Sequence, residues 1–415
     1  MANGRLLLDG VRILDVGAGE FLGPTSIAIE DERIVGIGSD RVFDEGTALR
    51  IDGAGLTAVP GLINLHVHLC LDASIDTLRH LLEADDPAVL ASMERSAHAT
   101  LRGGITTVRD LGCRGNLIFE LRRRIEEGRC KGPRIVAGGE ALTRSGGHGA
   151  GWIGRECDGE DGVRVGARQQ LGGGADVLKA MATGGVMSLG TSPYLATYGL
   201  QELEAIVEEG RRENVAVAAH AEGREGIELA VRAGVSTVEH GTFMDDAIAA
   251  EMIQRGSVWI PTISPHRFAE RARTASRTPS EQEAVPVRSR RERGRTPATR
   301  SITVAALSHF ERCCRTPGLR LGLGSDAGTP LVPHDDLVVE MEMFVEQGYS
   351  LAGVLRMATL GNAEILQLDD TLGSIAPGKL ADIVLVEGNP LETLDALRQI
   401  RHVLKGGEVV AAASE

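Results

Sequence analysis

The sequence predicts an α/β fold, namely a (β/α)8 TIM barrel with a small β-sandwich domain that both termini build together. Short apolar runs alternate with helical stretches through the middle of the chain, eight times in all. Both ends instead contain brief strand-like runs that Gly and Asp interrupt. The 53 glycines suit many tight turns between strands and helices. We therefore expect a sandwich from residues 1–59 and 371–415, and a barrel over residues 60–370.

The terminal strands are expected at both ends of the sequence. Their ranges are 5–8, 11–14, 26–30 and 33–37 near the start, and 381–386, 399–404 and 408–410 near the end. Neither group is large enough for a stable sheet alone. This is why the two groups are expected to form one sandwich.

The eight barrel strands are expected at residues 62–68, 105–109, 134–137, 177–181, 215–220, 237–240, 258–260 and 321–324. Helical stretches fill the gaps, for example residues 200–212 and 226–233. In barrels of this kind the chemistry lies at the C-terminal ends of the strands. Polar residues at those ends are therefore the candidates for function.

The pair His66 and His68 ends the first barrel strand. Residues i and i+2 of a strand point to the same face, so both imidazoles would meet above the strand end. Two neutral imidazoles at one point form part of a divalent cation site. Alone, such a pair is a weak signal.

Four further polar residues lie at or near the ends of other predicted strands: Lys179, His220, His240 and Asp326. A buried, hydrogen-bonded histidine is the ordinary explanation for one such residue, but the full set favours a metal centre. A free lysine ammonium beside a dication would be repelled, and its burial would cost more free energy. A carbamate formed from Lys179 and carbon dioxide is anionic and can bridge two metals. The alternative for Lys179 is a simple ion pair or a side chain that reaches solvent.

These residues, in this order, resemble the amidohydrolase superfamily. Residues 59–68 resemble that family's first barrel strand, and residues 373–384 resemble its return to the β-sandwich. The stretches 104–110, 145–149, 182–187 and 238–242 are similar to the imidazolonepropionase-related branch. That branch includes Xaa-Pro dipeptidases and carboxypeptidase-like metal hydrolases.

The resemblance implies a binuclear metal centre. His66, His68 and Asp326 would bind one metal, and His220 and His240 would bind the second. Carboxylated Lys179 would bridge the two metals, which requires carbon dioxide or bicarbonate. Zinc is the favoured metal because the ligand set mixes imidazole and carboxylate groups.

The function that follows is hydrolysis of a C–N bond, in the amide or peptide group of a small substrate. A dipeptide or an N-acyl amino acid is the expected substrate, and Asp326 is the expected general base and acid. The alternative reaction is the opening of a cyclic amide or lactone, as in imidazolonepropionase-like chemistry. A catalytically silent scaffold would be expected to lose ligands, whereas this chain keeps all six.

Four residues are candidates for substrate contact: His148, Tyr194, Tyr198 and Glu222. His148 would lie over the barrel mouth, or else only order its loop, and the two tyrosines would line a pocket or lie on the surface. Peptidases of this branch often carry an aromatic residue shortly after the fifth-strand histidine, where it helps to hold the substrate carboxylate. Glu222 takes that place here. It would repel a carboxylate and suit an amine or a neutral group.

The remaining features concern partners and location. A net charge of −14 argues against nucleic acid or an anionic membrane as the main partner. Cysteines without CxxC spacing, and the lack of a signal segment or a membrane-length apolar run, favour a cytoplasmic enzyme. Arg109 and Asp110, at the end of the second strand, are interpreted as a structural pair, and the alternative is that they orient the site. The Arg-rich residues 267–300 suggest a lid, an anion-binding loop or a solvated insertion, and homo-oligomer formation stays open.

Overall fold

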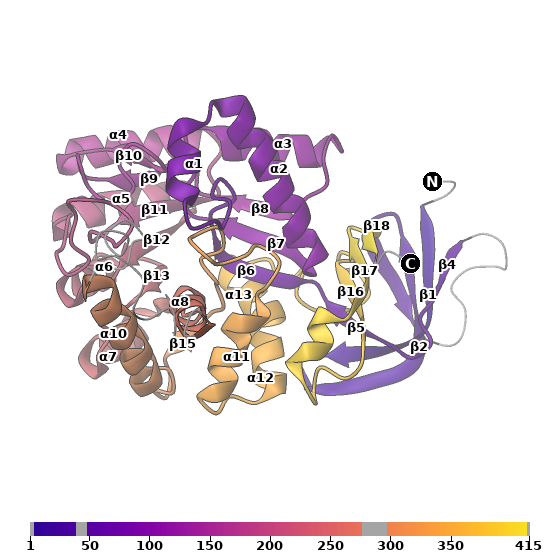
Figure 1. Cartoon of the computed structure of the whole chain (residues 1–415). Helices are drawn as coiled ribbons and strands as arrows, with labels where there is room; N and C mark the ends of the chain where they lie inside the picture. Colours follow the sequence, from indigo (N-terminus) through magenta and orange to yellow (C-terminus); the bar gives the residue numbers. More distant parts are fainter. Residues whose placement is uncertain (1–3, 39–47, 276–296, 413–415) are drawn as a thin grey trace.

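The computed structural model describes residues 4–38, 48–275 and 297–412. Two parts lie side by side in Figure 1. One is a body of parallel strands and helices, and the other is a sheet in which N-terminal and C-terminal strands meet. The parallel α/β architecture predicted from the sequence is confirmed.

The body contains two sheets whose neighbouring strands are all parallel. The first sheet runs in the order β6 (Leu62–Val67), β7 (Ile105–Asp110), β8 (Arg134–Ala137). The second runs in the order β10 (Gly154–Glu156), β9 (Ala141–Thr143), β11 (Val177–Met181), β12 (Ala216–Ala221), β13 (Thr237–His240), β14 (Val258–Ile260), β15 (Arg320–Leu321). Strands that are buried on both faces explain the nearly continuous apolar runs in the sequence.

Backbone hydrogen bonds connect both edge strands of the first sheet, β6 and β8, to the second sheet. The Leu65 N–H donates to the Leu323 carbonyl at 3.0 Å, and the Asp176 N–H donates to the Ala137 carbonyl at 2.8 Å. At the first edge the Asp326 N–H also donates to the His66 carbonyl at 2.9 Å. This contact brings two candidate ligands together that lie 260 positions apart in the sequence.

Two strand predictions need correction. The strand expected at residues 321–324 is reduced to Arg320–Leu321, since the glycines that follow pack against β6 without a regular ladder. A Cβ atom on Gly324 would lie 2.8 Å from the Cβ of His66, so only glycine fits this approach. The short strands β9 and β10 were not predicted, because three residues carry too little periodicity.

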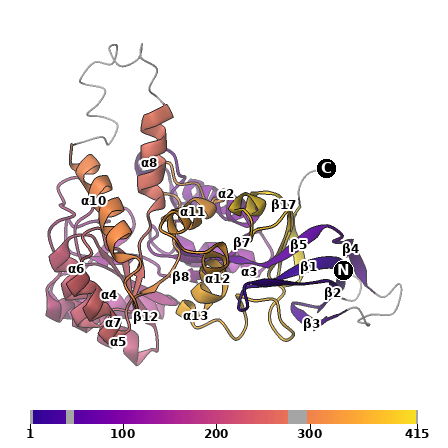
Figure 2. The ribbon, with the colours of Figure 1, turned by 90° about the horizontal axis from the view of Figure 1, so that it is seen from below.

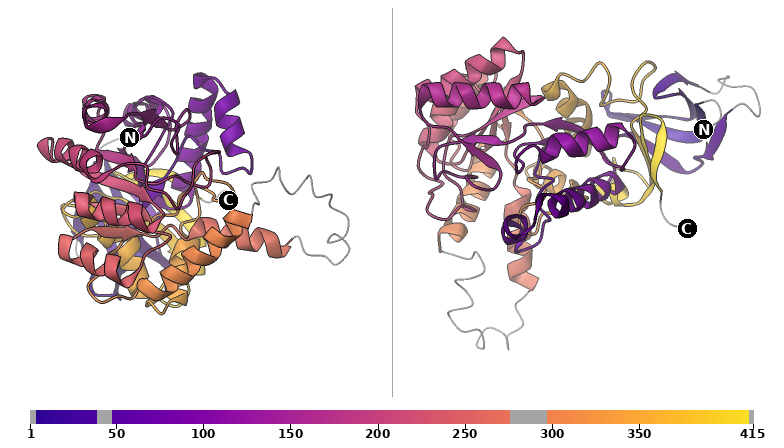
Figure 3. Two further views of the ribbon diagram at one scale, coloured as in Figure 1. Left: turned by 90° about the vertical axis from the view of Figure 1, so that its left-hand side faces the viewer. Right: turned by 90° about the horizontal axis from the view of Figure 1, so that it is seen from above.

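Helices cover the outside of the strands, as Figure 3 shows. Their bounds are α1 (Thr77–Glu83), α2 (Asp86–Arg102), α3 (Leu117–Glu126), α4 (Gly159–Gly172), α5 (Leu200–Arg212), α6 (Arg224–Ala233), α7 (Asp246–Arg255), α11 (Val338–Glu346), α12 (Leu351–Arg356), η1 (Met357–Gly361) and α13 (Asn362–Leu366). Helices α5 and α6 occupy the expected ranges. In α5, the buried Leu203, Ile206 and Val207 lie at helical spacing and form the face toward the strands.

Helices α8 (Ser264–Ala275) and α10 (Pro297–Cys313) stand together and project from the body in Figure 2. They flank the Arg-rich segment. At its start, Arg267 pairs with Glu346, and Arg271 pairs with Glu342 at 3.1 Å. Outside the described residues lie Arg288, Arg290, Arg291, Arg293 and Arg295.

The terminal strands form one eight-stranded sheet. Its order is β18 (Glu408–Ala412), β17 (Ile400–Lys405), β16 (Ile383–Glu387), β5 (Leu56–Pro60), β1 (Arg5–Asp15), β2 (Glu20–Glu30), β3 (Arg33–Ile37), with β4 (Leu49–Asp52) also paired to β1, and the short helix η2 (Leu394–Arg398) precedes β17. Strands β5 and β16 join the two termini, with Val59 opposite Val384. Residues 5–8 and 11–14 form a single strand rather than two, with a register shift between Leu8 and Val11.

This sheet also anchors the start of the functional region. The apolar side chains of both termini share a core of their own, to which Leu8, Ile27 and Ile383 contribute. Strand β5 ends at Pro60 and leads through Gly61 directly into β6, the strand that carries His66. Among the described residues, no helix is long and apolar enough to cross a membrane.

Candidate metal centre

Four histidines from three strands form a row of neighbouring imidazoles. The ring centroids of His66 and His68 are 5.3 Å apart, and those of His66 and His240 are 5.0 Å apart. The ring of His220 follows at 4.7 Å from that of His240. The ends of β6, β12 and β13 therefore bring together the imidazoles that the sequence predicted to meet.

Asp326 completes a group of three possible ligands. Its Oδ1 lies 3.5 Å from His66 Nε2 and 3.4 Å from His68 Nε2. The ligand atoms of these three buried residues all lie within 4.8 Å of one another, so one metal ion could contact all of them. Asp326 Oδ1 is buried and has no hydrogen-bond partner within the described structure, which leaves it free to bind a cation.

His66 and His68 each use one ring nitrogen as a hydrogen-bond donor and direct the other toward Asp326. His66 Nδ1 donates to Glu239 Oε2 at 2.8 Å, and His68 Nδ1 donates to the Gly112 carbonyl at 2.9 Å. These contacts set the tautomer and the ring orientation. In the neutral form of each ring, Nε2 then carries a lone pair that is available to a cation at the common site.

His220 and His240 follow the same rule. His220 Nε2 donates to the Gly184 carbonyl at 3.0 Å, which leaves Nδ1 free. His240 Nδ1 lies 2.7 Å from Thr262 Oγ1. Because the Thr262 hydroxyl donates to the Pro261 carbonyl, it accepts from His240 and leaves Nε2 free. The sequence did not predict Thr262, which lies two residues after β14.

Lys179 is the third residue of β11 and is almost completely buried. Its Nζ has no hydrogen-bond partner in the described structure. Burial lowers the pKa of this amine to about 8. The Lys179 charge also lowers the pKa of His66, His220 and His240, so the amine lies in the same electrostatic neighbourhood. A buried amine nitrogen without a hydrogen-bond partner among the described residues fits a lysine that becomes carboxylated and then binds metal.

The histidines differ in protonation. Burial holds the pKa of His66, His220 and His240 well below the usual value, so these rings stay neutral, the form that binds metals. Burial opposes protonation of His68 too, but the Asp326 carboxylate, 3.4 Å from its Nε2, raises the pKa to about 9. A proton on His68 therefore competes with a cation for the same place.

Two candidate ligands have unusual backbone angles. His240 has φ of +68° and Asp326 has φ of +57°, in the left-handed region that residues other than glycine rarely adopt. Such strain persists only where the surroundings hold it, and it concentrates at functional sites. Both residues stand at the end of an extended segment, and there the left-handed backbone conformation sets the direction of the side chain.

A buried ion pair supports the first histidine. Arg109 Nη2 donates to Glu239 Oε1 at 2.9 Å, while Glu239 Oε2 accepts from His66. Arg109 Nε also donates to the Leu65 carbonyl at 2.7 Å. Arg109 therefore pairs with Glu239, a partner that the sequence analysis missed, whereas Asp110 accepts the Leu69 N–H at 2.8 Å. The signal was present, since Glu239 is a charged residue inside a four-residue strand next to His240.

We expect Glu239→Leu to lower the free energy of unfolding by about 3–5 kcal/mol, because it leaves the buried Arg109 charge without a partner. Chemical denaturation of metal-free protein measures this. Glu387→Leu is the matched control, since it breaks the half-exposed pair with Arg401, and exposed pairs contribute little. Equal decreases in the free energy of unfolding for the two variants would contradict the role of Glu239 as the partner of the buried Arg109 charge.

His148 lies beside the second pair of candidate ligands. It comes from the loop between β9 and β10, and its ring centroid is 4.6 Å from that of His220. Its Nδ1 lies 3.0 Å from Ser188 Oγ. Burial lowers its pKa to about 3, so the ring is neutral at physiological pH.

The other three candidates for substrate contact have different surroundings. Tyr194 is half exposed, and its hydroxyl lies 3.1 Å from Ser301 Oγ. Tyr198 is buried, and its hydroxyl already donates to the Cys157 carbonyl at 2.9 Å. Glu222 is buried directly after β12, and burial raises its pKa to about 7.

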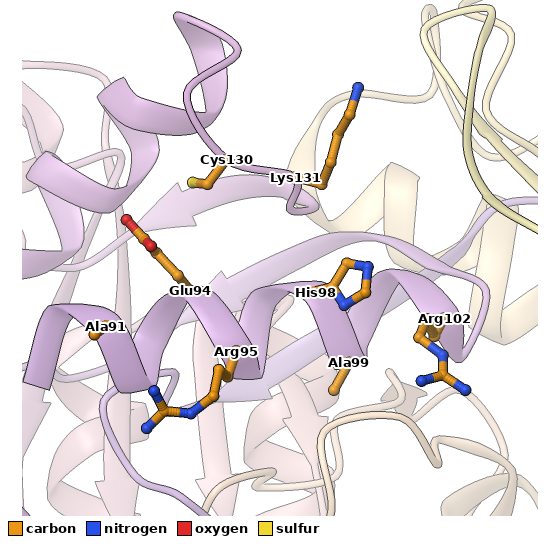
Figure 4. A pocket seen from close by; sticks show the side chains of 8 residues that line it. All are labelled: Ala91, Glu94, Arg95, His98, Ala99, Arg102, Cys130 and Lys131. Atoms are coloured by element: carbon orange, nitrogen blue, oxygen red, sulfur yellow. The ribbon is translucent and has the colours of Figure 1, made fainter.

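A separate hollow of about 610 Å³ lies on the outer face of α2 (Figure 4). Glu94, Arg95, His98 and Arg102 from α2 line it together with Lys131. None of the candidate ligands lines it. The candidate centre is therefore defined by converging side chains and not by this hollow.

Comparison with known proteins gives concordant results. The family model described as the amidohydrolase family matches residues 57–410. Ochratoxinase of Aspergillus niger is 28% identical over 429 residues, covering 96% of this chain and 85% of that protein. A solved Xaa-Pro dipeptidase with methionine bound in its active site is 29% identical, with a TM-score of 0.85, covering 98% of this chain and 99% of its own. A solved prolidase complexed with N-methylphosphonate-L-proline is 31% identical, with a TM-score of 0.80, and the match covers 98% of this chain and 100% of that protein.

Proposed function

Because this chain belongs to the amidohydrolase family and hydrolyses carbon–nitrogen bonds, we propose that it cleaves the amide bond of a dipeptide or an N-acyl amino acid. The proposed reaction uses two divalent metal ions. The group formed by His66, His68 and Asp326 carries the proposal, because its ligand atoms lie within 4.8 Å of one another. The buried Asp326 Oδ1, which has no hydrogen-bond partner among the residues that the structure describes, supports the same conclusion.

In this proposal His66, His68 and Asp326 would hold the first metal, and His220 and His240 would hold the second. Lys179, carboxylated by carbon dioxide or bicarbonate, would help to hold both. The neutral amine attacks carbon dioxide and releases one proton, which gives an anionic carbamate. Zinc is the proposed metal because imidazole nitrogens and carboxylate oxygens are its usual ligands.

The residues divide the chemistry between them. When bound, the metal ions would acidify a water molecule and polarise the substrate carbonyl. Asp326 would accept the proton of the attacking water and pass it to the leaving nitrogen. His148 would donate a hydrogen bond to the substrate carbonyl or carboxylate, Tyr194 and Tyr198 would form the pocket wall, and Glu222 would contact a substrate end.

The similar proteins support a small amide or peptide as the substrate. They are a Xaa-Pro dipeptidase, a prolidase bound to a proline derivative, and an ochratoxinase. These proteins match nearly the whole of this chain. We therefore propose a small amide or peptide as the substrate of this chain and leave the identity of its amino acid open.

Finer features of the fold belong to the same proposal. The edge contacts of Leu65 with Leu323 and of Ala137 with Asp176 support one closed (β/α)8 barrel. The shared terminal sheet, with its own core, supports a β-sandwich. The proposed domains are residues 60–370 for the barrel, and 1–59 with 371–415 for the sandwich.

Removal of the metal is expected to abolish hydrolysis, and zinc with bicarbonate is expected to restore it. The experiment combines metal analysis of purified protein with a library of dipeptides, N-acyl amino acids, cyclic amides and lactones. We expect two metal ions per chain and turnover of linear amides. Turnover that persists after complete chelation would contradict the metal-dependent mechanism, and turnover of cyclic substrates alone would favour ring opening.

A further inference from the structure

Glu222 places a carboxylate beside the candidate metal centre. Its Oε1 lies 3.7 Å from His220 Nε2, and its side chain is buried. The imidazole does not satisfy this oxygen, since His220 Nε2 donates at the shorter distance of 3.0 Å to the Gly184 carbonyl. The other oxygen, Oε2, accepts a hydrogen bond of 3.2 Å from the Thr242 hydroxyl.

Other buried glutamates of this chain pair with arginine or accept several hydrogen bonds. Glu239 pairs with Arg109, and Glu209 pairs with three arginines of α4 and α5. Glu340 accepts the backbone N–H groups of Ile263 and Ser264 at 3.0 and 2.6 Å. These contacts follow the general rule that a buried carboxylate collects charged or multiple donors.

Glu222 departs from this rule. Within the described part of the chain, its ion-pair contacts include no lysine or arginine, and its side chain accepts a single hydrogen bond from a neutral hydroxyl. Its Oε1 oxygen, next to a site that must admit a ligand, is therefore open to a hydrogen-bond donor from that ligand.

We propose that Glu222 selects the substrate by charge, through a hydrogen bond from a nitrogen of the substrate end that lies beside His220. The substrate class is then a small amide in which this end carries an ammonium or a primary amide in place of a carboxylate. An ammonium would supply both a hydrogen bond and a positive charge to Oε1, whereas a carboxylate would meet the like charge of ionised Glu222, whose ion-pair contacts with the described residues include no lysine or arginine. This inference rests on the proposed amide hydrolysis and specifies its substrate.

The test uses three amides that share one acyl group and differ in the amine part: glycine, glycinamide and ethylenediamine. They present a carboxylate, a neutral amide and an ammonium on nearly the same frame. A mirrored series places the same three groups on the acyl side, because either end of the substrate can face His220. The measured quantity is the ratio of kcat/KM values for the ammonium and the carboxylate substrate.

For the unaltered protein we expect a ratio of about 10–100 in one of the two series, the range of a hydrogen bond to a charged group. Glu222→Gln keeps the size of the side chain and removes its charge, so the ratio should fall by about tenfold. Glu222→Lys should reverse the preference. Glu387→Gln, on an exposed strand end, is the control that should leave the ratio unchanged.

Calorimetric binding of the glycine and ethylenediamine products gives a readout that is independent of turnover. A carboxylate preference in the unaltered protein, or a ratio that Glu222→Gln leaves unchanged, would overturn the inference. If the Gln variant does not fold, as judged by its circular dichroism, the ratio for the unaltered protein still decides. Absence of hydrolysis with every member of both series would instead count against the proposed amide hydrolysis.

Discussion

Lys179→Ala is expected to lose most of the bound metal and to abolish turnover. In the proposed centre Lys179 is the residue that contacts both metal ions, so its removal weakens both sites together. The side chain comes from the middle of β11, where it is buried and its Nζ has no hydrogen-bond partner among the described residues. Glu239, whose charge also acts on the Lys179 amine, is not free to replace it, because Arg109 and His66 engage both of its oxygens.

Metal analysis after gel filtration measures the first effect, and steady-state hydrolysis measures the second. Acetate or propionate should restore part of both, since a small carboxylate can enter the space that the truncated side chain leaves. Acetamide is the matched control, because it has nearly the same shape without the charge. Full metal occupancy in Lys179→Ala would contradict the bridging role.

A general folding defect gives a different pattern. In metal-free protein, Lys179→Met should be at least as stable as the unaltered chain, because burial of an unpartnered ammonium costs several kcal/mol. Chemical denaturation without metal tests this point. A Met variant that is much less stable than the unaltered protein would assign Lys179 to a structural ion pair, the alternative weighed from the sequence.

The candidate ligands could be predicted from the sequence because they lie in short apolar strands. A histidine or aspartate at the end of such a strand is conspicuous, and the i, i+2 spacing of His66 and His68 gives their direction. The order of the strands then follows from the alternation with helices. For this reason the α/β architecture and the convergence of the four histidines could be predicted before any coordinates.

The supporting residues could not be predicted in the same way. Glu239, Thr262 and Gly112 act on the histidines through contacts between different strands, which depend on register and on ring orientation. The left-handed backbone of His240 and Asp326 has no sequence signal, since neither residue is glycine. The reduced strand β15 reflects glycines that pack closely against β6, a tertiary effect that overrides local pattern.

Tyr198 shows the limit for substrate contacts. From the sequence, its place in the loop after the lysine strand suggested a pocket wall or a hydrogen bond to substrate. In the structure its hydroxyl donates to the Cys157 carbonyl, so the pocket wall is the role that we retain as a proposal. Loop residues follow no simple periodicity. Which of their side chains face the site therefore depends on the final packing.

Asp326→Asn is expected to keep most of the bound metal but to lower kcat by about 10²–10⁴, the usual contribution of general acid–base catalysis. The carboxamide keeps one oxygen in place and cannot accept the proton of the attacking water. The backbone constraints remain, since the Asp326 N–H still donates to the His66 carbonyl, and asparagine tolerates a φ of +57° better than most residues.

The measurement pairs kcat with metal content over a range of pH. Because the lost group is a proton carrier, the pH dependence of kcat should change in shape and not only in height. Asp335→Asn, an exposed residue of the same loop region, is the matched control and should affect neither quantity. Near-normal turnover in Asp326→Asn would mean that another group moves the proton. His148 would then be the next residue to replace, since its neutral ring stands beside His220 and can accept a proton there.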